Sequence, residues 1–343
     1  MFAAAAHADG LLLFPSLSYF DRYASDDPDI KAHEFVPALD IFYTANFDQF
    51  RFIGEYYASN REKEMERLQA GWRIMPGKTL WLGRFHNPLS FWNTELHHGN
   101  FLQTSISRPA IANYEDAQGI LPAHITGLLL ESSRAVDDAE ISYAAGVGIG
   151  PTIETSSSAT RAPFAGLKAF DLLDPKHPGK IAAGFRLAYH PEAASANQVG
   201  ASLGYARIEA RDLAPVTEVR QTVLGAFFTW EKQQLKFVGE AFALDHHVAG
   251  AANPSSRTVL SAYLQPEYRF NDSLAAFARV EGTSRAADSY LALLPEFPVR
   301  RVGGGIRFDF YDSHAVKVEF NRDRHHHGAE FSSLSVQWSM IYP

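Results

Sequence analysis

Short and long connections alternate along almost the whole of this 343-residue chain. Segments of about ten residues with period-two hydrophobicity are joined by a tight turn, then a long connection, then a tight turn again. A membrane barrel sorts its connections in this way, because its short turns share one side of the membrane and its long loops the other. A soluble β-sandwich has no such constraint on the lengths of its connections. The predicted tight turns lie at 46–48, 76–77, 137–138, 232–233, 271–272 and 312–313, and the long connections at 23–33, 59–65, 87–121, 151–178, 246–256, 285–298 and 324–330.

The period-two pattern predicts sixteen strands. In the last segment, Leu334, Val336 and Trp338 share one face, and Ser335 and Gln337 share the other. An even number agrees with a bacterial single-chain barrel. The pattern is ambiguous at 122–133 and 217–230, so fourteen strands is the alternative. The segments are 11–22, 34–45, 49–58, 66–75, 78–86, 122–133, 138–150, 179–190, 197–210, 217–230, 234–245, 257–270, 273–284, 299–311, 314–323 and 331–342.

The rest of the composition narrows the fold class to all-β. No apolar run approaches the roughly 18 residues of a spanning helix, so a membrane location requires a closed barrel. Sixteen strands in a soluble sandwich would need two or more domains, and no linker or fixed-period repeat separates them. The chain has no cysteine, which excludes disulfide scaffolds and thiol catalysis, and its net charge of −8 argues against a nucleic-acid partner.

The N-terminus is predicted to lie outside the barrel. Ala6-His7-Ala8 fits the small-x-small pattern that precedes a signal-peptidase cut, although the charged and apolar parts of a signal peptide are missing. We therefore interpret residues 1–9 as a signal-peptide remnant or a disordered terminus, and residues 10–343 as a single barrel domain.

Over its whole length the chain resembles the outer-membrane porins of Gram-negative bacteria. The resemblance lies in sixteen strands, in a final strand with aromatic residues, and in a longest connection, Asn87 to Leu121, after the fifth strand. It implies a location in the outer membrane, with lipid and lipopolysaccharide as neighbours, and assembly as a homo-trimer. One departure is the ending Ile341-Tyr342-Pro343, since porins usually end on Phe.

The resemblance also implies that the 87–121 connection folds into the lumen and narrows it to a constriction. A connection this long without secondary structure is commonly functional, and the alternative is an extracellular lid whose acids are merely solvated. The predicted constriction joins Glu95, Arg108, Glu115 and Asp116 of this connection to Arg51, Arg73, Arg84 and Arg307 of the wall.

Further charges share the lumen-facing parity of the strands. Opposed charges along a channel create a transverse field that selects solutes by charge; the alternative is that they pair across neighbouring strands and stiffen the wall. The excess of bases slightly favours anionic or polar solutes. The predicted wall residues are Glu55, Arg67, Arg186, Lys236, Arg279, Arg301, Asp309 and Lys317, and further acids with the same parity are Glu240, Glu281 and Glu319.

Histidines gather in segments that we expect to be outer loops. Imidazoles from several loops can bind Zn²⁺ or Cu²⁺, but adjacent residues rarely ligate one ion, and we predict no metal or other cofactor. The candidates are His97, His98, His246, His247, His325, His326 and His327.

The sequence therefore predicts passive diffusion of small polar or charged solutes through a water-filled channel. The alternative is a surface binding protein or adhesin, with or without metal-binding loops, whose plugged barrel is only an anchor. An enzyme is not predicted, because there is no phosphate-binding loop and no His-Glu-x-x-His motif, and no residue is identified as a nucleophile. Small and aliphatic residues that would allow barrels to pack in a trimer are Ile141, Ala145, Val147, Ile149, Ala275, Ala276 and Ala278, with Gly146 and Gly148 beside them.

Overall fold

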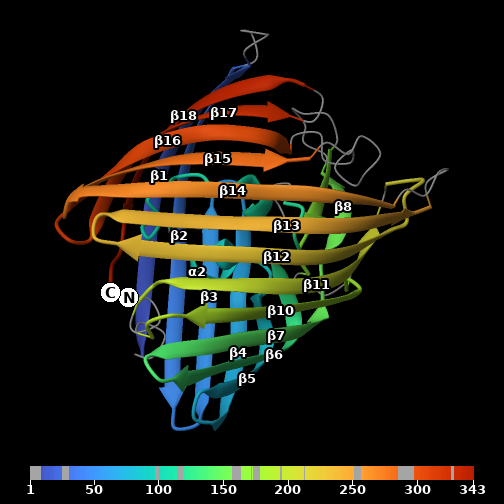
Figure 1. Cartoon of the computed structure of the whole chain (residues 1–343). Helices are drawn as coiled ribbons and strands as arrows, with labels where there is room; N and C mark the ends of the chain where they lie inside the picture. The colour runs from blue at the N-terminus through green and yellow to red at the C-terminus, as the bar shows by residue number, and fades with distance from the viewer. Residues whose placement is uncertain are drawn as a thin grey trace.

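Antiparallel strands form one closed ring in the computed structural model of the chain (Figure 1). The first strand, β1 (Gly10–Ala24), pairs with the last, β18 (Glu330–Met340), with Ser16 opposite Ser339. The predicted barrel of sixteen strands is confirmed, and the alternative of fourteen is wrong. The other strands of the ring are β2 (Lys31–Phe47), β3 (Phe50–Ser59), β4 (Lys63–Met75), β5 (Lys78–His86), β6 (His124–Val136), β7 (Ala139–Ile149), β10 (Ile181–His190), β11 (Gln198–Ala210), β12 (Glu218–Lys232), β13 (Leu235–Ala249), β14 (Ser256–Asn271), β15 (Leu274–Thr283), β16 (Pro298–Phe310) and β17 (His314–His325).

The structure describes most of the chain, in ranges separated by short gaps. Residues 1–8 of the predicted signal-peptide remnant or disordered terminus (1–9) lie outside these ranges. No helix among the described residues is long and apolar enough to cross a membrane. The ranges are 9–24, 31–96, 100–113, 119–156, 164–170, 172, 178–193, 195–211, 213–250, 256–284, 297–325 and 328–343.

Tight turns join the strands where they are predicted. Asp48, Asp137 and Gln233 adopt positive φ angles there, and Gly77 has φ of 72° with its carbonyl accepting from Ser133 N at 2.8 Å. A side chain at position 77 would begin 2.5 Å from the Ser133 carbonyl oxygen, so this turn requires glycine.

The connections predicted at 23–33, 59–65, 246–256 and 324–330 are shorter than expected. β3 ends at Ser59 and β4 begins at Lys63, and β13 continues to Ala249. The predicted connections at 59–65 and 246–256 are therefore wrong in extent. The hydrogen-bonded ladder runs past the apolar part of each strand, and polar residues such as His247 (opposite Ser256) still belong to it.

The long connections contain elements that were not predicted. The 87–121 connection holds α2 (Phe91–Glu95) and the 3-10 turn η1 (Ala110–Ala112). The connection after β7 holds the hairpin of β8 (Thr152–Ser156) and β9 (Phe164–Lys168). β8 pairs in parallel with the end of β11, with Thr152 opposite Glu209.

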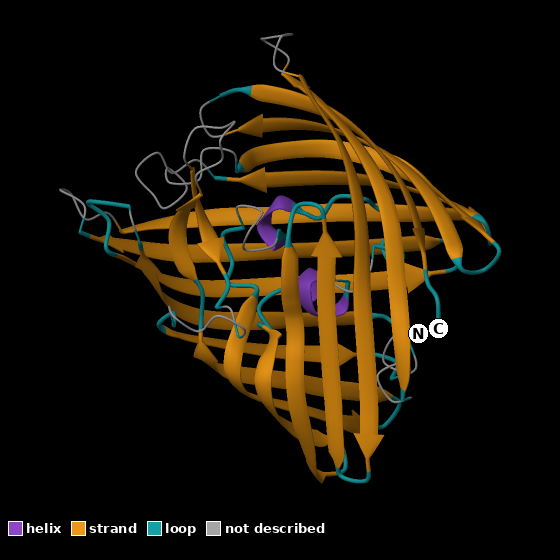
Figure 2. Ribbon diagram, turned by 180° about the vertical axis from the view of Figure 1, so that it is seen from behind, coloured by secondary structure: helices purple, strands orange, loops and turns teal. Residues whose placement is uncertain are grey.

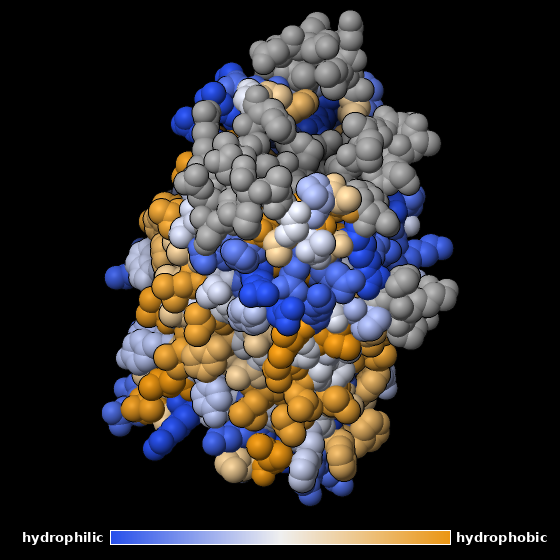
Figure 3. Space-filling view, turned by 90° about the vertical axis from the view of Figure 1, so that its right-hand side faces the viewer, coloured by the Kyte–Doolittle hydropathy of each residue, from blue (hydrophilic) through white to orange (hydrophobic). Residues whose placement is uncertain are grey.

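The outer surface of the ring is apolar, as the alternation predicts. Large side chains on the outward parity are among the most exposed of the chain: Leu82 is 63% exposed, Leu224 60% and Leu260 58%. Figure 3 shows hydrophobic residues over much of the lower part of one face, with hydrophilic residues above them. A broad apolar surface of this kind is typical of an outer face that contacts lipid.

Candidate functional site

The connection between β5 and β6 begins and ends at one point of the wall. Asn87 N donates to the Ala123 carbonyl (2.8 Å), and Asn87 Nδ2 donates to the Pro122 carbonyl (3.0 Å). Between these contacts the chain makes an excursion that includes α2 and η1, and Figure 2 shows both helical turns within the ring of strands. We call residues 87–123 the inner segment.

The start of α2 is held by a buried carboxylate from the opposite wall. Glu240 of β13 accepts hydrogen bonds from Phe91 N (2.6 Å), Trp92 N (3.1 Å), Ser90 Oγ (2.9 Å) and Tyr263 OH (2.8 Å). Its side chain is 3% exposed. Hydrogen bonds to an ionised acceptor are strong, and a negative charge is favourable at the first N–H groups of a helix. Glu240 therefore positions α2 against β13.

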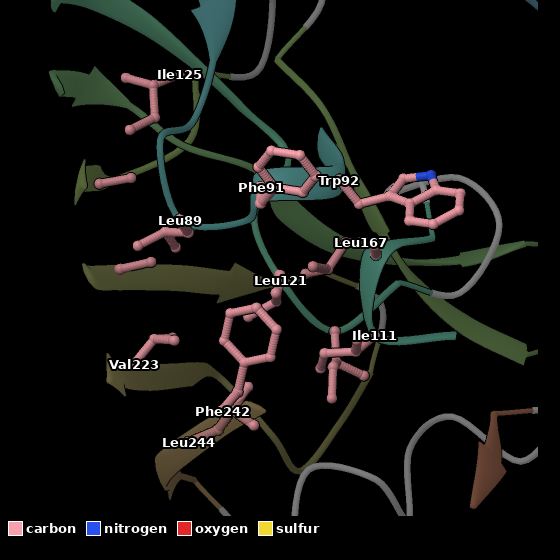
Figure 4. Close-up of a cluster of buried hydrophobic side chains, with 14 of the residues drawn as sticks. Leu89, Phe91, Trp92, Ile111, Leu121, Ile125, Leu167, Val223, Phe242 and Leu244 are labelled. Carbon is pink, nitrogen blue, oxygen red and sulfur yellow. The ribbon is translucent and has the colours of Figure 1, made fainter. Parts of the chain in front are cut away.

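Apolar side chains of the inner segment pack against the inner face of β12 and β13. Figure 4 shows Leu89, Phe91 and Trp92 with Val223 and Phe242, which all belong to one buried cluster. The rings of Phe91 and Phe227 are stacked with centroids 5.8 Å apart. On this side the barrel interior is therefore a packed hydrophobic core.

Two wall glycines allow the first residues of the inner segment to approach the wall closely. A side chain at Gly184 would begin 2.0 Å from Asn87 Oδ1, and one at Gly204 would begin 2.4 Å from a methyl carbon of Leu89. Gly184 and Gly204 are direct partners in the β10–β11 ladder. Two residues before Gly204 on β11, Ser202 Oγ donates to the Leu89 carbonyl at 2.7 Å. The stretch Gly200–Gly204 matches the letters of the Gly-x-Ser-x-Gly motif of serine hydrolases. Ser202 nevertheless lies in the middle of β11, not at the strand-to-helix turn that this motif requires.

Acidic wall residues bind backbone N–H groups further along the inner segment. Glu319 of β17 accepts from Ile106 N (2.5 Å) and Ser107 N (3.0 Å), and Glu281 of β15 accepts from Ala110 N (2.6 Å). Both carboxylates are buried. They therefore satisfy donors of a stretch that has almost no regular secondary structure of its own.

Basic wall residues bind the carbonyl groups of the same stretch. These cations were predicted to line the lumen, and in the structure each donates to the backbone of the inner segment. The contacts are Arg307 to Gln103 (2.9 Å), Lys317 to Ser105 (3.3 Å), Arg279 to Ser107 (3.0 Å) and Arg301 to Arg108 (3.1 Å).

A second group of charges faces the interior from β3, β4, β6 and β10. Arg67 is paired with Glu55 at 2.7 Å, and Arg186 with Glu95 of α2 at 2.9 Å. The Glu95 side chain is 40% exposed, in contrast to the buried carboxylates that hold the segment. Glu131 interacts electrostatically with Arg67, Arg186 and Glu95, and also with Arg51, which in turn interacts with Arg73. We call Arg51, Arg67, Arg73, Arg186, Glu95 and Glu131 the charged strip.

The remaining predicted residues of the constriction and wall lie outside the charged strip. Arg84 is 2% exposed, pairs with Glu64 and donates to the Phe170 carbonyl at 2.8 Å. Burial lowers the pKa of Arg108 to about 10. Lys236 lies 3.8 Å from Glu267, Asp309 is paired with Arg307 at 2.6 Å, and Glu115 and Asp116 lie outside the described residues.

Of the histidines predicted in outer loops, the three that lie among the described residues belong to strands. His246 and His247 are strand residues of β13, and His246 is fully buried with its Nε2 2.8 Å from Gln221 Nε2. The placement of this pair in a loop is wrong, because the β13 ladder continues past both residues. His325 ends β17 and packs on Phe331, with ring centroids 4.6 Å apart. His97, His98, His326 and His327 lie outside the described residues.

Sequence reasoning missed a group of titratable side chains at the base of the inner segment. Glu66, His86 and His124 are buried, and their ligand atoms lie within 4.8 Å of one another. Nearby, burial and the charges of Glu66 and Glu64 raise the pKa of Glu62 to about 6. The signal available in the sequence was the position of His86 and His124 at facing ends of two consecutive strands.

No model of a known protein family matches the chain, and no curated protein matches it. Solved structures do match in fold. The outer membrane channel DcaP of Acinetobacter baumannii has a TM-score of 0.57 at 9% identity, covering 97% of this chain and 98% of that one. A mutant of the Rh. blastica porin has 0.51 at 11%, covering 96% and 100%. The trimer form of OmpT, an outer membrane protein of Vibrio cholerae, has 0.56 at 9%, covering 98% and 100%.

Proposed function

Because its fold is that of the porins, we propose that this chain is a passive channel for small polar solutes in the outer membrane of a Gram-negative bacterium. The observation that carries the proposal is the closed ring of sixteen strands, apolar outside and lined by charges inside. A barrel of this size encloses more space than the side chains of its own wall fill. Outer-membrane lipid and lipopolysaccharide would surround it, and the proposal assigns it no chemical reaction.

The route for solutes lies along the charged strip. The inner segment occupies the side of the lumen next to β12–β17, where its backbone is bound and its apolar side chains are packed. The side next to β3–β7 and β10 carries Arg51, Arg67, Arg73 and Arg186 together with Glu131, and Glu95 approaches them from α2. Four cations against Glu95, Glu131 and Glu55, the partner of Arg67, leave a net positive charge, which favours anions over cations of the same size.

The inner segment is the constricting element of this channel. In the proposed arrangement Glu95 reaches the solute path from α2, and Arg186 faces it from β10 at 2.9 Å. Arg279, Arg301, Arg307 and Lys317 act mainly by donating hydrogen bonds to the backbone of the inner segment. They therefore determine the position of the constriction more than its charge.

A surface binding protein with a closed lumen is the second candidate. The observation that favours it is the buried apolar core between the inner segment and β12–β13, which leaves less open cross-section than a wall lined only by charges. Proteoliposome swelling separates the two. A channel admits small sugars and amino acids and swells the vesicles, whereas a closed anchor, inserted at the same density, leaves them unchanged.

We further propose that three barrels associate. Outward-facing Ile141 and Val147 lie beside Ala145 on β7, and Ala276 and Ala278 are outward on β15, so these surfaces are smooth. Small residues let membrane-embedded surfaces approach closely, where packing drives association. Gly146 takes no part, because a side chain there would point inward, 2.6 Å from Phe85.

A further inference from the structure

Three potential metal ligands from neighbouring strands meet at the base of the inner segment. Glu66 belongs to β4, His86 is the last residue of β5, and His124 is the first residue of β6. His124 Nε2 lies 3.0 Å from Glu66 Oε2, and the two imidazole centroids are 5.1 Å apart. The residues are 4%, 6% and 5% exposed.

The strand register explains why these side chains converge. His86 and His124 are direct partners in the β5–β6 ladder. On β4 and β5, Leu68 is the partner of Arg84, so a step of two residues along each strand brings Glu66 level with His86 on the same face. Three adjacent strands therefore present their ligands side by side at one level of the wall.

We propose that Glu66, His86 and His124 bind one divalent transition-metal ion, and that Zn²⁺ is the ion that their donor set fits best. Two imidazoles and one carboxylate are a common three-residue set for Zn²⁺, whereas Mg²⁺ and Ca²⁺ prefer shells made of oxygen. Bonds of about 2.0–2.1 Å separate ligand atoms on a tetrahedron by about 3.4 Å. The observed separations, 4.8 Å at most, reach this value through small side-chain rotations.

The surrounding charges are compatible with a cation. Glu62 and Glu64 lie on the same side as Glu66, and the charges of both other carboxylates act on Glu62. Arg84 pairs with Glu64 and Arg108 interacts with Glu66. Arg61 also acts on Glu62 and is itself paired with Glu34 at 2.6 Å. Four carboxylates against three guanidinium groups leave an excess of negative charge that a bound cation would offset.

The position of the site indicates what the ion does. His86 and His124 are the residues directly before and after the inner segment, so an ion shared by them joins its two ends. The same ends are already joined by the hydrogen bonds of Asn87 to Pro122 and Ala123 and of Asn93 Nδ2 to Ala123. Metal binding would therefore stabilise the attachment of the inner segment to the wall. This effect does not depend on whether the lumen conducts solutes.

The direct test is Zn²⁺ titration of the full-length protein in detergent after chelator treatment. Calorimetry is expected to show one Zn²⁺ per chain, and His124→Gln to weaken binding by at least about tenfold. His247→Gln, which changes an exposed imidazole on β13, is the matched control and should bind as the unmodified protein does. Absence of Zn²⁺ binding, or equal binding by the His124→Gln variant, overturns the proposal.

A second measurement needs no variant to fold. X-ray absorption at the zinc edge of the loaded, unmodified protein is expected to show two imidazole nitrogens and carboxylate oxygen in the coordination shell. A shell of oxygen alone, or one with a single imidazole, overturns the proposal, and in that case the 3.0 Å contact of His124 with Glu66 is a simple ion pair.

Discussion

The charged residues inside this barrel fall into two groups with different roles. Glu240, Glu281 and Glu319 are buried and accept hydrogen bonds from backbone N–H groups of the inner segment. Arg73 and Glu95 are more accessible and face the remaining space. Buried hydrogen bonds to a charge stabilise strongly because loss of one partner leaves the other desolvated. Substitutions in the first group should alter structure, and those in the second should alter selectivity.

Glu240→Gln is expected to loosen α2. An amide has one acceptor oxygen where the carboxylate has two, so Phe91 N and Trp92 N can no longer both be satisfied. The free energy of unfolding should fall by about 1.5–3 kcal/mol, measured by urea unfolding in detergent. Amide exchange at positions 91 and 92 should accelerate. The exposed Glu192→Gln serves as control, and equal stability of the two variants would contradict the role assigned to Glu240.

Arg73→Glu is expected to change ion selectivity with little effect on stability. Arg73 points inward on β4 from the position opposite Thr79, and reversal of its charge removes the net positive charge of the charged strip. The reversal potential in a salt gradient should move toward that of a cation-selective channel. Arg134→Glu is the control, since Arg134 shares the outward face of exposed Ile141. Equal shifts in both variants would place Arg73 outside the conducting path.

Glu62 is expected to make stability depend on pH. Burial raises its pKa in the folded protein to about 6 from 4.5, so the folded state binds the extra proton between these values. Its contribution to stability therefore decreases as pH rises through this window, and by pH 7 it destabilises by at most about 2 kcal/mol. Glu62→Gln should raise the melting temperature at pH 7 and leave it unchanged at pH 4, with chelator present. An increase of the same size at both pH values would assign the effect to packing.

At the scale of elements, the strands were predictable and the course of the inner segment was not. Period-two alternation is a local property, so it located the ring strands to within a few residues. The ambiguity of the pattern at 217–230 has a physical cause. Val223 and Phe227 face the packed inner segment while Leu224 and Phe228 face outward, so both faces of β12 are apolar. Acceptors such as Glu240 lie about 150 positions from their donors, and no local pattern reveals such a pairing. The cluster of Glu66, His86 and His124 was not predicted for the same reason.

Deletion of residues 95–116 is expected to widen the channel. The deletion removes Glu95, η1 and most backbone groups that Glu281 and Glu319 bind, while α2 remains attached to Glu240. Single-channel conductance should increase, and the barrel should still form because every ring strand is retained. A folded deletion variant with unchanged conductance would show that the segment does not limit the path.

At the scale of the whole molecule, closure of the ring determines the environment in which the chain is stable. Every ring strand has two neighbours, so no edge is left to pair with another chain. The outward side chains are apolar and need lipid or detergent to cover them. Leu13 and Tyr342 exchange two backbone hydrogen bonds of 2.9 Å, which fixes both ends of the described chain next to the closing strand pair.

The assembly proposal predicts a mass of three chains in mild detergent, about three times 38.0 kDa. Ala145→Trp together with Ala276→Trp should disrupt close packing between barrels and give the mass of one chain, with the barrel intact. Native mass spectrometry or light scattering with detergent correction decides this. A single-chain mass for the unmodified protein at high concentration would rule the trimer out.

Recording from single molecules in a planar bilayer tests the central claim most directly. If the lumen is an open path beside the inner segment, purified protein should insert with stepwise increases in current, and the reversal potential in a salt gradient should indicate a preference for anions. If protein that is shown to be folded and inserted produces no steps at any applied voltage, the lumen is closed, and the barrel is an anchor and not a channel.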